Sequence, residues 1–143
     1  MSAYALALTV LAFSLVSCAF AFVKGGSQER IAAAIILANL LATMANESFL
    51  HDQRVLLAID GVTALALLPL TLRYASMWMG AIMLLYGGQF ALHAFYFVLE
   101  RRKDLLHVAI NNTNFFAISL CLAIGTAYAM ARRARVRRAA IQA

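Results

Sequence analysis

Five long apolar stretches, separated by short charged segments, make up almost the whole of this 143-residue chain. The stretches are residues 2–23, 31–50, 55–72, 74–99 and 105–131. An α-helix of about 20 residues spans the roughly 30 Å hydrocarbon core of a bilayer, so each stretch is long enough to cross it. No stretch alternates apolar and polar residues like a barrel strand, and a backbone in lipid must satisfy its own hydrogen bonds. We therefore expect an all-α fold, an integral membrane bundle of five transmembrane helices.

The composition supports this class and excludes others. Hydrophobic residues make up 64% of the chain and charged residues 13%, whereas a soluble domain is about half apolar and a quarter charged. With Cys18 and Cys121 as its only cysteines, the chain is not a disulfide scaffold, and it has no room for a separate soluble catalytic domain. We expect a single bundle domain over residues 1–131, followed by a basic cytoplasmic tail over residues 132–143.

The stretch 55–72 is the least regular of the five. It contains Asp60 near one end and Pro69 near the other. It could be a tilted span or a shorter helix shielded by its neighbours. The hydropathy pattern favours five spans over four.

Basic residues are distributed unequally between the two ends of the predicted bundle. Eight lie on the side of the C-terminus and four on the opposite side. The positive-inside rule therefore predicts an outside N-terminus and a cytoplasmic C-terminus. The arginines of the tail are expected to anchor this topology and to contact anionic lipid headgroups; they are Arg132, Arg133, Arg135, Arg137 and Arg138. Nucleic-acid binding is not expected, because the tail is short and has no interleaved aromatic residues.

Polar and ionisable side chains recur at helical spacing within four of the stretches. Ionisable groups inside a membrane usually face the interior of a bundle or a water-filled cavity. At 1.5 Å per residue from the helix ends, most of these side chains fall in the outer half of the bundle, with Asn39 and Gln89 near the midplane. The residues expected to line a polar pocket or contact a partner are Asn39, Glu47, Asp60, Gln89, His93, Tyr96, His107, Asn111 and Asn114.

Several kinds of chemistry fit such a set. The residues could form only interhelical hydrogen bonds, which specify packing without any ligand. Glu47, Asp60, His93 and His107 could together ligate a transition metal, the two histidines could ligate a haem, and His93, Tyr96 and Asn111 could bind a quinone headgroup. None of these ligands is strongly indicated, because no pair has the spacing of a helical metal motif and the histidines differ in depth. No nucleophile lies beside a histidine, so no catalytic residues and no enzymatic activity are predicted.

Stripes of small residues predict close helix packing, either within the bundle or between copies of the chain. One stripe is Ala34, Ala38 and Ala42, and the other is Ala117, Cys121 and Gly125.

The leading hypothesis is a non-enzymatic accessory or assembly subunit that docks on a larger membrane complex or self-associates. The alternative is a membrane protein that holds or transfers a metal, haem or quinone in the outer-half pocket. A third hypothesis is a small ion-conducting oligomer, although the inner half lacks a comparable polar set. The expected partners are membrane lipids and another membrane protein or further copies of the chain. Abundant alanine and an excess of arginine over lysine are typical of GC-rich bacteria, and indicate a bacterial cytoplasmic membrane.

Overall fold

The computed structural model describes residues 3–101 and 104–142, and this part of the chain is all-helical without strands. The five helices are α1 (Ala3–Lys24), α2 (Ser27–Ala45), α3 (Gln53–Tyr74), α4 (Met77–Val98) and α5 (Leu105–Gln142), and a π-helical turn η1 (Asn46–Leu50) continues α2. Each of the five helices is long and apolar enough to cross a membrane. The all-α class and the five-helix prediction are therefore confirmed.

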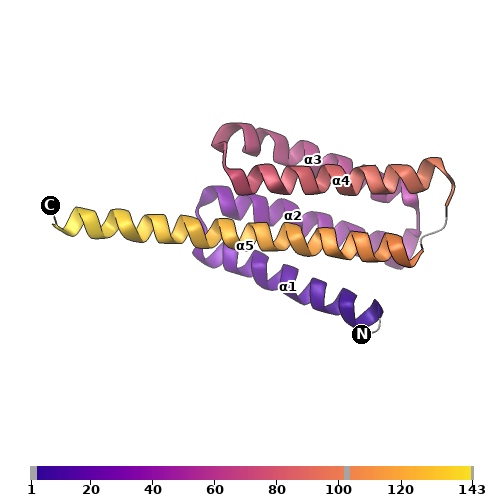
Figure 1. Cartoon of the computed structure of the whole chain (residues 1–143), viewed down its shortest axis with the longest axis horizontal. Coiled ribbons are helices and arrows are strands. Elements are labelled where there is room, and N and C mark those ends of the chain that lie inside the picture. The colour runs from indigo at the N-terminus through magenta and orange to yellow at the C-terminus, as the bar shows by residue number, and fades with distance from the viewer. Residues whose placement is uncertain (1–2, 102–103, 143) are drawn as a thin grey trace.

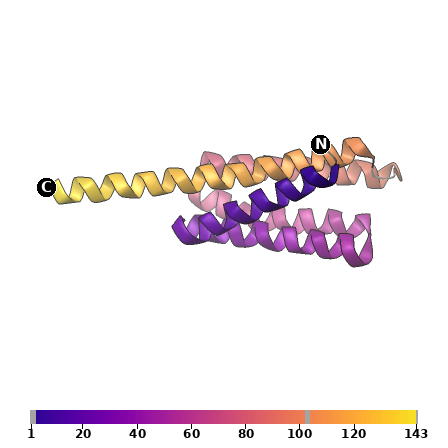
Figure 2. The same cartoon turned by 90° about the horizontal axis from the view of Figure 1, so that it is seen from below.

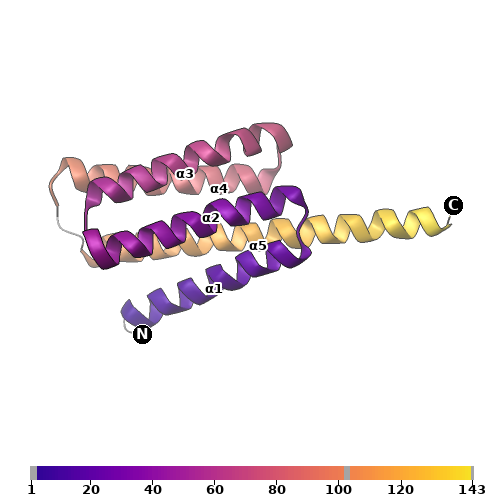
Figure 3. The same ribbon diagram turned by 180° about the vertical axis from the view of Figure 1, so that it is seen from behind.

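The helices run alternately in opposite directions and are joined by short connections (Figure 1). Helices α3 and α4 pack together at one side, α2 and α5 occupy the middle, and α1 packs against α5 and α2 on the other side. The view from behind shows the same order (Figure 3). Helix α5 is central because it contacts α1, α4 and α2.

Helix α2 begins at Ser27, before the predicted start of the second stretch at residue 31. The side chain of Glu29 accepts a hydrogen bond of 2.7 Å from the backbone N–H of Gly26. Glu29 and Arg30, which the sequence places between two apolar stretches, therefore lie in the first turn of the helix, because a carboxylate is stabilised near a helix N-terminus.

Helix α3 is one continuous helix of 22 residues, so the chain does not form the shorter helix that Asp60 and Pro69 had left open for this stretch. It begins after Asp52, whose side chain accepts a hydrogen bond of 2.8 Å from the backbone N–H of Arg54. Pro69 lies within the helix and is exposed on its outer face. The helix ends before Ala75, which adopts a left-handed conformation with a φ of 44°.

Helix α5 continues through the basic residues to Gln142 instead of ending near residue 131. Alanine and arginine are strong helix formers, and no glycine or proline follows Gly125. The terminal part of α5 extends beyond the other helices as a projecting rod (Figures 1 and 2). We call residues 130–142 the α5 arm, and all of them are exposed.

All five helices contribute to the apolar core, which includes the fully buried residues Ile36, Leu67, Ile82, Ile118 and Leu122. Gly125 on α5 packs directly against Trp78 on α4, since a Cβ at position 125 would lie 2.5 Å from Cδ2 of the indole. Of the predicted packing residues on α5, Gly125 is therefore at a close helix contact, whereas Ala117 and Cys121 are half-buried.

The predicted small-residue stripe of α2 does not face the interior of the bundle. Ala34 and Ala38 are exposed, and Ala42 is half-buried. The buried residues of this part of α2 are instead Ala32, Ala33 and Ile36. The helix is rotated so that Asn39 faces inward, which places Ala34 about 140° around the helix axis from it.

Candidate functional site

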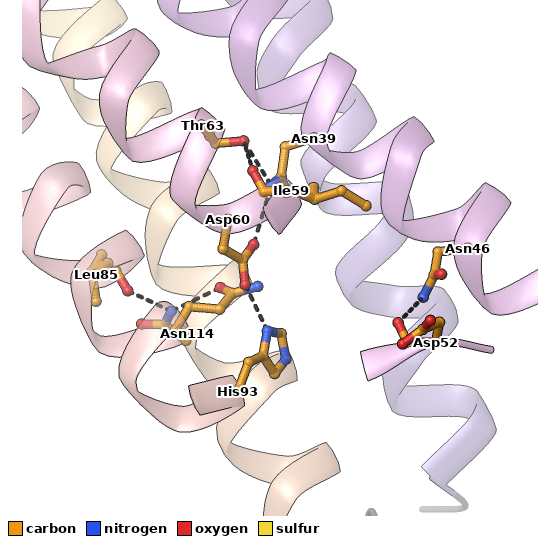
Figure 4. A network of polar contacts seen from close by, with 10 residues as sticks. Asn39, Asn46, Asp52, Ile59, Asp60, Thr63, Leu85, His93 and Asn114 are labelled. Atoms are coloured by element: carbon orange, nitrogen blue, oxygen red, sulfur yellow. Dashed lines mark hydrogen bonds and ion pairs between the residues drawn. The ribbon is translucent and has the colours of Figure 1, made fainter. Parts of the chain in front are cut away.

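A buried contact between an aspartate on α3 and a histidine on α4 lies at the centre of the cluster of polar side chains. Nδ1 of His93 lies 2.6 Å from Oδ2 of Asp60 (Figure 4). The side chains of His93 and Asp60 are 7% and 2% exposed. Two ionisable groups removed from water in this way are stable only when each has close partners.

The second carboxylate oxygen of Asp60 is held from α2. Nδ2 of Asn39 donates to Oδ1 of Asp60 at 3.2 Å and lies 2.9 Å from Oγ1 of Thr63 (Figure 4). The Thr63 hydroxyl in turn donates to the backbone carbonyl of Ile59. Asn39, Asp60, Thr63 and His93, which we call the Asp60 cluster, therefore join α2, α3 and α4.

Aromatic rings connect this cluster to the start of α5. The rings of His93 and His107 meet edge to face with their centroids 5.2 Å apart, and His107 stacks on Tyr96 at 4.6 Å. The Tyr96 hydroxyl donates to Oδ1 of Asp104 at 2.7 Å.

Asp104 lies in the connection between α4 and α5 and caps the first turn of α5. The same Oδ1 accepts the backbone N–H of His107 at 2.8 Å. The hydrogen bond from Tyr96 and the one from His107 N–H hold the pKa of Asp104 below its usual value of 3.8. Asp104 therefore stays charged at neutral pH and fixes the end of α4 to the start of α5.

A second polar contact links α4 and α5 deeper in the bundle. Nδ2 of Asn114 donates to Oε1 of Gln89 at 2.9 Å and to the backbone carbonyl of Leu85 at 2.8 Å (Figure 4). Asn111 is half-buried, and its Oδ1 has no hydrogen-bond partner among the described residues.

Glu47 is the predicted pocket residue that the structure places elsewhere. It is exposed on the π-helical turn, whereas Asn46 is buried and donates to the backbone carbonyl of Asp52 at 3.1 Å. Residue 46 lies seven positions from Asn39, close to two full turns, so it shares the inward face. Residue 47 is rotated about 80° from that face, which explains why Glu47 lies outside the cluster.

The space around the histidines is small. The cavity lined by Leu56, His93, Tyr96, His107 and Gln53 has a volume of about 10 Å³, enough for about one water molecule. This space is much smaller than a porphyrin or a quinone ring. Glu47, one of the four predicted metal ligands, is exposed and lies away from Asp60 and the two histidines. Among the described residues, no group of three histidine, cysteine, aspartate or glutamate side chains is placed to hold a metal ion.

A buried contact in the middle of the bundle was not predicted from the sequence. The hydroxyls of Ser14 on α1 and Ser119 on α5 lie 2.7 Å apart and are both buried. Isolated serines are common in membrane helices, so only their pairing across 105 positions of the chain identifies this contact. It links α1 to the central helix.

A basic surface occupies the opposite end of the molecule. The five arginines predicted to contact lipid headgroups all lie on α5 beyond Ala131 and are exposed. Arg132, Arg133 and Arg137 line a groove of about 1100 Å³ together with the start of α2 and the α3–α4 connection. Arg135 and Arg138 do not line it.

Comparison of the chain with protein-family models, curated proteins and solved structures finds no match in any of the three.

Proposed function

We propose that this protein is a non-enzymatic accessory subunit of the bacterial cytoplasmic membrane, and that it docks on a larger membrane protein complex. Its five helices cross the bilayer with the N-terminus outside and the C-terminus in the cytoplasm. The α5 arm carries the contact with the partner.

The projection of the α5 arm is the observation that carries this proposal. The arm extends past the other helices, and its Val136 and Ile141 side chains are 64% and 84% exposed. A single helix of this length is only marginally stable in water without tertiary packing. A partner that packs on the arm would supply the missing contacts.

The charge distribution supports the orientation. Three helix ends lie at the same end of the bundle as the α5 arm (Figure 1). They are the end of α1 with Lys24, the start of α2 with Arg30 and the end of α3 with Arg73. Together with the arginines of the arm, these residues give that end eight of the twelve basic residues. The positive-inside rule assigns this end to the cytoplasm.

The Asp60 cluster supports a structural role within the bundle. Asn39, Asp60 and His93 come from three helices and bond to one another rather than lining an open cavity. A buried hydrogen-bonded network that joins three helices fixes the rotation of each of them. The bundle then acts as a rigid membrane anchor for the arm.

Site-specific photo-crosslinking in native membranes tests the proposal. A photoreactive amino acid at Ala134 or Ile141 is expected to give one adduct with an integral membrane protein, identified by mass spectrometry. Neither position lines the groove beside Trp78. The matched control is Leu84, an 80% exposed residue on α4, which is expected to give no such adduct.

The crosslinked species also separates docking from self-association. An adduct with the mass of two copies of this chain indicates a homo-oligomer and overturns docking on another protein. The absence of any protein adduct from both arm positions, together with a lone monomer in mild detergent, rejects the accessory role.

A further inference from the structure

The groove at the predicted cytoplasmic end is formed by three parts of the chain that are distant in sequence. One wall is the start of α2, the second is the connection between α3 and α4, and the third is α5 on either side of Tyr128. Nε2 of Gln28 donates to Oγ of Ser76 at 2.7 Å and joins the first two walls. This hydrogen bond gives the groove a fixed rim.

Positive charge gathers on one side of the groove. Arg132, Arg133 and Arg137 line it. Among the described residues, the carboxylates within 4.0 Å of a basic side chain are Asp60, beside His93, and Asp104, beside Arg101, so none of these three arginines has a direct carboxylate partner.

Arg133 is held in place by the turn between α1 and α2. It donates to the backbone carbonyl of Lys24. A Cβ at Gly26 would lie 2.8 Å from Nη1 of Arg133, so the glycine is what allows the guanidinium to approach the turn. The one carboxylate that lines the groove, Glu29, is buried and accepts the backbone N–H of Gly26 at 2.7 Å. The carboxylate of Glu29 caps the start of α2, and its Oε2 lies 3.1 Å from the same Cβ position on Gly26, so it also offsets part of the charge of Arg133.

The remainder of the groove is apolar and aromatic. Trp78 packs on Gly125, and Met77 and Ile124 are 93% and 58% exposed beside it. Tryptophan and tyrosine are enriched at the boundary between the headgroups and the hydrocarbon. The groove thus has a cationic part next to the arm and an apolar part next to the bundle.

We propose that this groove binds one anionic phospholipid. Arg133 and Arg137 bind the phosphate group of the lipid, since guanidinium groups make charge-assisted and often bidentate hydrogen bonds to phosphate. An acyl chain lies along Trp78 and Ile124. A free phosphate ion or an acidic soluble segment would match the arginines but would leave the apolar part of the groove exposed.

Trp78 provides the probe, because it is the only tryptophan of the chain. The full-length protein is reconstituted in phosphatidylcholine vesicles that contain increasing fractions of phosphatidylglycerol with brominated acyl chains. Bromine quenches tryptophan fluorescence on contact. Brominated phosphatidylglycerol is expected to quench Trp78 at a several-fold lower mole fraction than brominated phosphatidylcholine.

Two double variants of equal charge separate a specific site from general attraction to a charged surface. The R133Q/R137Q variant removes arginines of the groove, whereas R135Q/R138Q removes arginines outside it. R133Q/R137Q is expected to reduce the preference for phosphatidylglycerol by about tenfold or more for each arginine, because each loses a direct charge-assisted contact with the headgroup. R135Q/R138Q is expected to lose only the surface attraction, about fivefold or less for each arginine. Circular dichroism checks that both variants keep the helical content.

Three outcomes overturn the proposal. Equal quenching by the two brominated lipids shows that the groove does not select an anionic headgroup. Equal losses in the two double variants show that the preference is only surface attraction. Loss of the preference on addition of inorganic phosphate, at an ionic strength matched with chloride, identifies a free-anion site instead of a lipid site. None of these outcomes depends on whether the arm docks on a protein partner.

Discussion

Oδ2 of Asp60 and Nδ1 of His93 lie 2.6 Å apart between α3 and α4, in the interior of a bundle whose other core residues are mostly apolar. Asn39 donates to the other carboxylate oxygen from α2. The pair therefore has partners on both sides of the carboxylate, and the loss of one member leaves the other buried without its main contact.

We expect Asp60→Ala and His93→Ala each to destabilise the bundle by about 1–3 kcal/mol. This range lies between the mean of about 0.6 kcal/mol for a membrane interhelical hydrogen bond and the 3–5 kcal/mol for a broken buried pair in a soluble protein. The free energy of unfolding is measured in mixed dodecyl maltoside and dodecyl sulfate micelles.

Asn112→Ala is the matched control for this pair, because Nδ2 of Asn112 has no hydrogen-bond partner among the described residues. It is expected to change the unfolding free energy by less than about 0.5 kcal/mol. Equal effects of the three substitutions would mean that the ion pair adds nothing beyond side-chain packing.

Gly125→Ala is expected to destabilise the bundle by about 1–3 kcal/mol, the usual cost of overfilling a packed interior. The added Cβ would lie 2.5 Å from the indole of Trp78, so the ring must move. The emission maximum of Trp78 and the unfolding free energy measure the two effects.

Gly88→Ala is the control for Gly125→Ala. A Cβ at position 88 has nothing within 4 Å, and alanine has the higher helix propensity. Neutral or increased stability is expected. If both alanine variants behave alike, the close contact between α4 and α5 at Trp78 is not present in the folded protein.

Acidification is expected to weaken the connection between α4 and α5 through Asp104. The pKa of this carboxyl is lowered in the folded protein, first by the Tyr96 hydroxyl and then by the His107 N–H. Its contribution to stability is therefore complete above the usual pKa of 3.8 and is lost as the pH falls through the lower folded value. Unfolding measured between neutral pH and about pH 2 reports this loss.

Asp104→Asn tests the assignment of that pH dependence, because an amide oxygen can still accept the two hydrogen bonds but does not titrate in this range. The variant is expected to lose part of the acid sensitivity of the native protein. An unchanged pH profile would assign the acid sensitivity to other carboxylates.

Cysteine labelling in intact cells tests the proposed orientation. Both native cysteines are first replaced, by Cys18→Ala and Cys121→Ala. In this background, Ser27→Cys places an exposed thiol at the start of α2, and Ser48→Cys places one at the opposite end, in η1. A membrane-impermeant maleimide is expected to label the Ser48→Cys variant alone, because Ser48 lies at the end predicted to be outside. Permeabilised cells are expected to show labelling of both variants, and labelling of Ser27→Cys alone in intact cells would reverse the topology.

The sequence by itself determined the number and nature of the helices. An apolar run of about 20 residues satisfies its own backbone hydrogen bonds only as a helix in lipid, and this holds whatever its neighbours are. The same local periodicity placed Asp60 with Thr63 and His93 with Gln89 on one face of their helices. These are properties of single segments, so they could be predicted without a partner helix.

Tertiary structure alone decided which faces meet. The rotation of α2 turned Asn39 and Asn46 inward and left Glu47 and Ala34 exposed. The contact of Ser14 with Ser119 and the groove beside Trp78 each combine helices that are distant in sequence. The rotation and neighbours of a helix depend on the side chains of the other helices, and hydrophobicity summed along one segment contains no information about them.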